Sequence, residues 1–147
     1  MSLNERLNED MKQAMKDKDK FRLSVIRMLR SSIKNVEIDQ RRPLEDSEVL
    51  DILQREVKQR KDSLQEFKKA GRDDLVESVQ AEIAIINEYL PKQLTEEEIK
   101  AVVQQTIQEV GASSKADMGK VMGALMPKVK GRADGRLVNQ IVQQFLQ

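Results

Sequence analysis

The 147-residue sequence contains no cysteine and no histidine. Without cysteine the chain forms no disulfide and no thiolate metal site, and without histidine it lacks the commonest general base and transition-metal ligand. Catalytic triads that pair serine or cysteine with histidine are therefore excluded. We expect neither a metal nor another cofactor, and no pair of carboxylates in the sequence is marked as catalytic.

Aromatic residues make up only 3% of the chain, and there are three prolines. β-Sandwiches and barrels use more β-branched and aromatic residues than this. The sequence contains no run of 18 apolar residues, the length that can cross a membrane. The start of the chain also lacks the apolar core of a signal peptide. We therefore expect a cytoplasmic protein without membrane contact.

The residues that are abundant favour long amphipathic helices, because 35% are charged and 39% hydrophobic. Apolar residues recur at helical spacing along most of the chain. We predict an all-α fold in two domains. Residues 1–91 form an elongated helical hairpin or bundle, and residues 95–147 form a small unit of three helices, joined by the proline-containing connector Pro91–Leu94.

Several helix ends are marked by cap residues. Asp19 is the expected N-cap of the second helix, and Thr95-x-x-Glu98 is a capping box that opens the fifth. Gly71 and Gly111 are placed where a helix needs a left-handed residue at its C-terminus. Pro127 and Gly131 are expected to end the helix before the last one, because proline lacks the N–H that continues a helix and glycine suits a helix C-terminus.

One stretch departs from plain amphipathic helix, and we call residues 117–139 the glycine-rich segment. Glycine inside a helix costs roughly 1 kcal/mol relative to alanine, so this cluster needs a reason. The segment holds four of the six glycines of the chain, Gly119, Gly123, Gly131 and Gly135, and five basic residues, Lys120, Lys128, Lys130, Arg132 and Arg136.

Two interpretations of the glycine-rich segment are open. In the first, its four glycines allow close packing and tight turns. In the second, the small residues let the backbone and the five basic side chains reach phosphate groups, with the start of the last helix offering N–H donors, although Asp134 there would repel an anion. No aromatic residue is interleaved to stack on bases, so contacts to nucleic acid would rely on phosphates and shape.

Other features are weaker. A basic face on the second helix, Arg22, Arg27, Arg30 and Lys34, usually means only solvation. The methionines Met118, Met122 and Met126 are typical of an adaptable core. Tyr89, the only tyrosine, is expected to be half-buried at the corner between the two domains.

Within the glycine-rich segment, three fragments resemble the tail domain of the B subunit of glutamine-dependent aspartyl/glutamyl-tRNA amidotransferase: Gly119-x-Val121-Met122, Lys128-x-x-Gly131-x-Ala133-Asp134 and Leu137-Val138-Asn139. Over its whole length the chain is similar to the stand-alone YqeY proteins of the GatB/YqeY family, through Arg22-Leu-Ser-Val-Ile-Arg-Met-Leu-Arg30, Glu56-Val-Lys-Gln-Arg-Lys61 and Tyr89-Leu-Pro-Lys-Gln-Leu94. The resemblance implies an all-helical fold whose C-terminal domain contacts the outer corner of tRNA, as the amidotransferase tail does. Related tails are appended to some glutaminyl-tRNA synthetases.

From this resemblance we expect a non-catalytic tRNA-binding accessory module whose five basic residues in the glycine-rich segment touch the tRNA backbone. An alternative is an adaptor that docks a tRNA amidotransferase or an aminoacyl-tRNA synthetase through the acidic middle helices and the methionines. Carbon–nitrogen ligase activity with glutamine as amido donor would follow from the family label alone, because the chain carries no catalytic cradle, glutaminase or ATP site.

Overall fold

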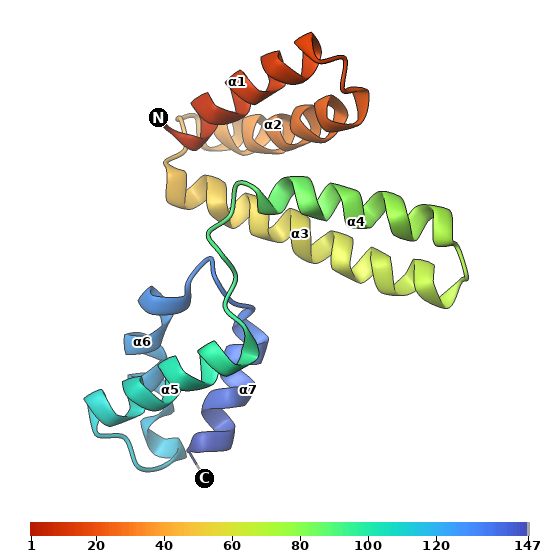
Figure 1. Ribbon diagram of the computed structural model, residues 1–147. Coiled ribbons are helices and arrows are strands. Elements are labelled where there is room, and N and C mark those ends of the chain that lie inside the picture. Colours follow the sequence, from red (N-terminus) through yellow and green to blue (C-terminus); the bar gives the residue numbers. More distant parts are fainter. Residues whose placement is uncertain (147) are drawn as a thin grey trace. The chain divides into compact units, whose positions relative to one another are not determined.

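The computed structural model of the protein describes residues 1–146 (Figure 1). Within this range the chain forms seven α-helices and one short 3₁₀ turn, and no strand, so the predicted all-α fold is confirmed. Contacts divide the chain into two compact units, Met1–Leu90 and Pro91–Gln147. That residues 1–91 and 95–147 are separate domains, each able to fold by itself, stays a prediction.

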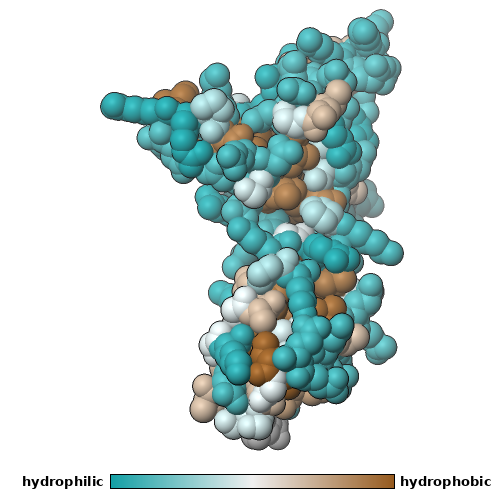
Figure 2. Space-filling model, turned by 90° about the vertical axis from the view of Figure 1, so that its left-hand side faces the viewer, coloured by the Kyte–Doolittle hydropathy of each residue, from teal (hydrophilic) through white to brown (hydrophobic). Residues whose placement is uncertain are grey.

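The first unit consists of two helical hairpins, α1 (Leu3–Lys16) with α2 (Lys20–Gln40), and α3 (Asp46–Lys69) with α4 (Asp73–Asn87). Helix α2 packs against both α3 and α4, which closes one core between the hairpins. On the face shown in Figure 2, hydrophilic residues cover most of this unit and hydrophobic residues gather near its middle. The fully buried side chains of the core include Leu7, Ile26, Leu29, Val49, Leu53 and Ile86.

The predicted caps of the first unit are present. The Asp19 carboxylate accepts from the backbone N–H of Arg22 at 3.1 Å, which satisfies a donor that the start of α2 would otherwise leave unpaired. Gly71 has a φ of 70°, the left-handed conformation that lets the chain leave α3 and enter α4. These local bonds fix where the long helices begin and end.

The second unit consists of α5 (Glu96–Val110), the 3₁₀ turn η1 (Lys115–Asp117), α6 (Met118–Val129) and α7 (Gly135–Phe145). Thr95 and Glu98 form the predicted capping box: the Thr95 hydroxyl accepts from the Glu98 N–H, and the Glu98 carboxylate accepts from the Thr95 N–H, each at 3.1 Å. Helix α5 packs on both α6 and α7. The core is Ile99, Val103, Val121, Leu125, Val129, Val138, Ile141, Val142 and Leu146.

The prediction that Pro127 ends a helix is wrong, because α6 continues through it to Val129. Proline in a helix fails to donate to the carbonyl four residues earlier, and here that carbonyl belongs to Gly123, which is exposed and open to water. The helix resumes its bonding afterwards, since the N–H of Lys130 donates to the carbonyl of Met126 at 2.8 Å. Gly131, with a φ of 81°, then turns the chain towards α7.

Candidate nucleic-acid interface

Helix α6 has two unlike faces. Val121, Leu125 and Val129 recur every four residues and are buried against α5 and α7. Gly119 and Gly123 have the same spacing but lie on the exposed side of the helix. The helix is therefore anchored by its valine and leucine side chains, and at Gly119 and Gly123 it exposes backbone without a side chain to solvent.

Close packing, one interpretation of the four glycines, fails for three of them. A Cβ atom built on Gly119, Gly123 or Gly135 meets no heavy atom within 4 Å. The fold of this unit would therefore accept alanine at each of these positions without a clash. Only Gly131 is buried, and its positive φ is a conformation that favours glycine.

Lys128, one of the five candidate phosphate contacts, is engaged inside the unit. Its ammonium lies 2.7 Å from the Glu109 carboxylate and donates to the hydroxyl of Thr106 at 3.1 Å. Thr106 is fully buried, and its own hydroxyl donates to the carbonyl of Val102 at 2.8 Å. Lys128 thus ties α6 to α5, and Glu109 neutralises much of its charge.

Arg132 is also used within the unit. Its Nε donates to the backbone carbonyl of Lys92 at 3.4 Å, and its own carbonyl accepts from the N–H of Leu94 at 2.8 Å. The Gln93 side-chain amide donates to the carbonyl of Gly131 at 2.9 Å beside it. These bonds fasten the turn before α7 to the start of the unit, so the Arg132 side chain is half-buried in a structural role.

The remaining three basic residues of the set, Lys120, Lys130 and Arg136, are exposed. Lys120 follows Gly119 at the start of α6, Lys130 directly follows the end of α6, and Arg136 lies in the first turn of α7. The start of α7 does not offer the N–H of Arg136 to an anion, because the Asp134 carboxylate accepts from it at 3.0 Å. The N-cap of α7 therefore competes with an anion for this donor.

The three methionines of α6 differ in how deeply they are buried. Met118 and Met122 are half-buried against the core, as expected, whereas Met126 is 39% exposed. Figure 2 shows hydrophobic and pale residues scattered among hydrophilic ones over the visible face of this unit.

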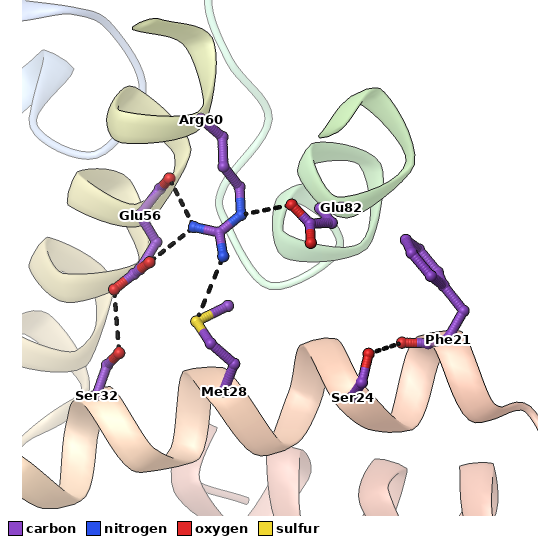
Figure 3. Close-up of polar contacts among 7 residues, drawn as sticks. All are labelled: Phe21, Ser24, Met28, Ser32, Glu56, Arg60 and Glu82. Carbon is purple, nitrogen blue, oxygen red and sulfur yellow. Dashed lines mark hydrogen bonds and ion pairs between the residues drawn. The ribbon is translucent and has the colours of Figure 1, made fainter. Parts of the chain in front are cut away.

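A polar cluster in the first unit was only partly predictable from sequence. The Arg60 guanidinium pairs with Glu56 at 2.7 Å and with Glu82 at 3.2 Å, and it also contacts the sulfur of Met28 (Figure 3). Ser32 donates to Glu56 at 3.0 Å. Only the pair of Glu56 and Arg60 has the local i, i+4 spacing that sequence can reveal. The cluster joins α2, α3 and α4 and is structural.

Tyr89 is buried rather than half-buried, at 4% exposure, and it belongs to the core of the first unit. Its hydroxyl donates to the Asp10 carboxylate, and the Arg6 guanidinium lies 4.6 Å from the ring centroid. Burial raises the pKa of Tyr89, with the bond to Asp10 adding to the shift. The residue therefore holds α1 against the end of α4 as a neutral phenol.

Across residues 1–146, no group of three or more acidic side chains is arranged to hold a metal ion. In the same described range, no helix is long and apolar enough to cross a membrane.

Comparison with known proteins identifies the family. Residues 4–146 match the family model described as Yqey-like protein. The chain belongs to this family. The more specific resemblance of its C-terminal part to the amidotransferase tail stays a prediction.

Three similar proteins come from fungi, and each is called "Altered inheritance of mitochondria protein 41, mitochondrial". The protein from Pyrenophora tritici-repentis is 33% identical over 96% of this chain and 79% of its own length. The Kluyveromyces lactis protein is 34% identical over 95% of this chain and 80% of its own. The Lachancea thermotolerans protein is 42% identical over 74% of this chain, which spans 59% of that relative.

These relatives correct the expected location. The absence of a signal-peptide core favoured the cytoplasm, but all three relatives are named as mitochondrial proteins. The cytoplasmic expectation is therefore wrong on this comparison. That expectation failed because the lack of a signal-peptide core argues only against secretion and does not distinguish the cytoplasm from mitochondria.

Proposed function

We propose that the protein is a non-catalytic tRNA-binding accessory module, and that the RNA backbone approaches the exposed glycine face of α6. The observation that carries this proposal is the open space at Gly119 and Gly123. Each glycine costs the helix roughly 1 kcal/mol relative to alanine, and packing within the unit gives no reason for either. A close approach from outside the molecule supplies one.

Charge around the glycines supports the same ligand. Lys120, Lys130 and Arg136 are exposed, and they lie at the start of α6, just after its end and at the start of α7. Lysine and arginine side chains and backbone N–H groups are the usual donors to phosphate oxygens. In the proposal these three residues contact phosphates, whereas Lys128 and Arg132 hold the surface in shape through their bonds to Glu109 and Lys92.

Family membership is compatible with this role, and the resemblance of the C-terminal part to an amidotransferase tail names tRNA as the ligand. A tRNA amidotransferase or an aminoacyl-tRNA synthetase is the enzyme that such a module would assist. The names of the relatives favour mitochondria as its setting.

Filter binding of bulk tRNA at several salt concentrations tests the proposal. Phosphate contacts predict an affinity that falls steeply with salt, with a log–log slope of roughly 0.9 per contact. The Lys120→Gln/Arg136→Gln variant should lower that slope by about 2. Arg55→Gln/Lys58→Gln, on the exposed side of α3, is the matched control with the same change of charge and should leave the slope unchanged.

Two outcomes would contradict the proposal. One is undetectable or salt-independent binding by the intact protein. The other is an equal loss in the variant and its control, which would reduce the effect to net charge. If the protein were instead an adaptor that binds an enzyme through its acidic middle helices, Lys120→Gln/Arg136→Gln would leave its affinity for that enzyme unchanged.

A further inference from the structure

The outward face of α2 carries a second set of cations. The sequence placed four basic residues on this helix face, and two of them are held within the unit. The Arg22 guanidinium pairs with the Glu88 carboxylate at 2.8 Å. Arg30 is half-buried, and one of its guanidinium nitrogens lies 2.9 Å from the sulfur of Met11. Arg27 and Lys34 remain exposed, and Lys20 at the start of the helix is exposed with them. We call Lys20, Arg27 and Lys34 the α2 row.

The α2 row follows one line along the helix. Its members are seven residues apart, which is almost two full turns, so they project on the same side at intervals of about 10 Å. The core side of α2 is opposite, where Val25, Ile26, Leu29 and Ile33 are buried. In Figure 3, Met28 and Ser32 turn to the flank that meets α3 and α4. The row therefore faces solvent along nearly the whole helix.

The middle of the row lacks carboxylate partners. Among the ion pairs of residues 1–146, none includes Lys20, Arg27 or Lys34. The Arg27 guanidinium instead lies 3.8 Å from the sulfur of Met15, a weak acceptor that leaves its charge uncompensated. Two arginines of this unit that face other elements, Arg22 and Arg60, are instead paired with acids.

We infer that the α2 row is a second contact surface for the phosphate backbone of a nucleic acid. Exposed Ser31 and Asn35 lie between and beside the cations, and such hydroxyl and amide side chains join lysine and arginine in backbone contacts. An acidic partner helix would need apolar anchors spaced along the middle of this face. Ser24 and Ser31 occupy those positions, and an exposed apolar residue of the face, Ile38, comes only near the end of α2.

The inference rests on the proposed function for its class of ligand, but it uses different residues in the other unit. The two claims therefore fail separately. The probe is bulk tRNA, and the variants are Lys20→Gln/Arg27→Gln/Lys34→Gln and a matched control, Arg55→Gln/Lys58→Gln/Lys61→Gln, which removes one arginine and two lysines from the exposed side of α3. All six side chains are exposed, so both variants should keep the unfolding midpoint of the parent protein.

The α2 triple variant should lower the salt slope by about 3 and weaken tRNA binding at 0.1 M salt by at least about tenfold, since each phosphate contact contributes roughly 0.9 to the slope. Equal binding by the triple variant and its control would overturn the inference. A loss in Lys120→Gln/Arg136→Gln alone would then leave the proposed function standing. If only the α2 triple variant lost tRNA affinity, the α2 row would be supported as a contact surface and the α6 surface would be refuted.

Polyglutamate separates a nucleic acid from an acidic protein as the occupant. The phosphate assignment predicts that polyglutamate of comparable charge competes weakly for the row. If polyglutamate binding fell in the α2 triple variant while tRNA binding did not, the row would be a docking site for an acidic protein and the inference would be wrong.

Discussion

The two units of the molecule use glycine and charge in different ways. In the first unit the single glycine, Gly71, lies at a turn with positive φ, and arginines such as Arg60 and Arg22 pair with acids on other helices. In the second unit, Gly119 and Gly123 lie inside a helix on its exposed side. The fold of the first unit accounts for nearly all of its unusual residues, whereas the fold of the second leaves two costly glycines unexplained. Function is best sought where structure does not account for the sequence.

The largest effect is expected at Arg60. Its side chain is 15% exposed, and Arg60→Met would leave Glu56 and Glu82 partly buried without a cation. Removing one partner of a buried pair costs 3–5 kcal/mol, and partial solvent access reduces this to about 2–3 kcal/mol here. Urea unfolding measures it. Arg55→Met on the exposed side of α3 is the control and should change stability by less than about 0.5 kcal/mol.

Gly131 tests the other half of the comparison. Its φ of 81° lies in the left-handed region, and the residue is buried. Gly131→Ala should therefore destabilise the protein by about 1–2 kcal/mol in thermal or urea unfolding. Gly119→Ala, at a helical position with open space, should instead stabilise it by about 1 kcal/mol. If both substitutions changed the free energy of unfolding in the same direction, the distinction between structural and unexplained glycines would fail.

A smaller effect is expected at the pair of Lys128 and Glu109. The side chains are 37% and 50% exposed, so solvent screens the pair and Glu109→Gln should cost less than about 1 kcal/mol. Releasing Lys128 should also add positive charge beside α6 and tighten tRNA binding at low salt. Unchanged tRNA affinity in Glu109→Gln would show that Lys128 has no access to the RNA. Glu66→Gln, at an exposed pair on α3, is the control.

The smallest effect concerns acid stability, where the units resemble each other. The hydrogen bond from Arg42 lowers the pKa of Glu48 to about 2, and the capping bonds from Thr95 lower the pKa of Glu98. A lowered folded-state pKa contributes stability above the ordinary value of about 4.5 that is lost as pH falls towards the folded pKa. Glu48→Gln should therefore flatten the stability curve between about pH 5 and pH 2. An unchanged curve would mean that the Arg42 contact does not persist in solution.

Much of the fold follows from local sequence because caps and turns are local. Asp19, Thr95 with Glu98, Gly71 and Gly111 were sufficient to place helix ends. Partners far apart in sequence were not predictable: Glu82 for Arg60, Glu109 for Lys128 and Asp10 for Tyr89 depend on how helices pack. Pro127 misled because the bond it breaks ends on an exposed carbonyl.

The exposure of the two α6 glycines could have been found from sequence. At 100° per residue, Gly119 and Gly123 point away from the line of Val121, Leu125 and Val129. The absence of any contact to a Cβ atom there required coordinates, because neighbouring helices could have covered that face.

The central claim is that Gly119 and Gly123 are kept for a partner and not for the fold. Gly119→Ala/Gly123→Ala should raise the free energy of unfolding by about 2 kcal/mol, and in filter binding it should weaken tRNA affinity even though the protein is more stable and its charge unchanged. A variant that is stabilised and binds tRNA as tightly as the parent protein would contradict the account.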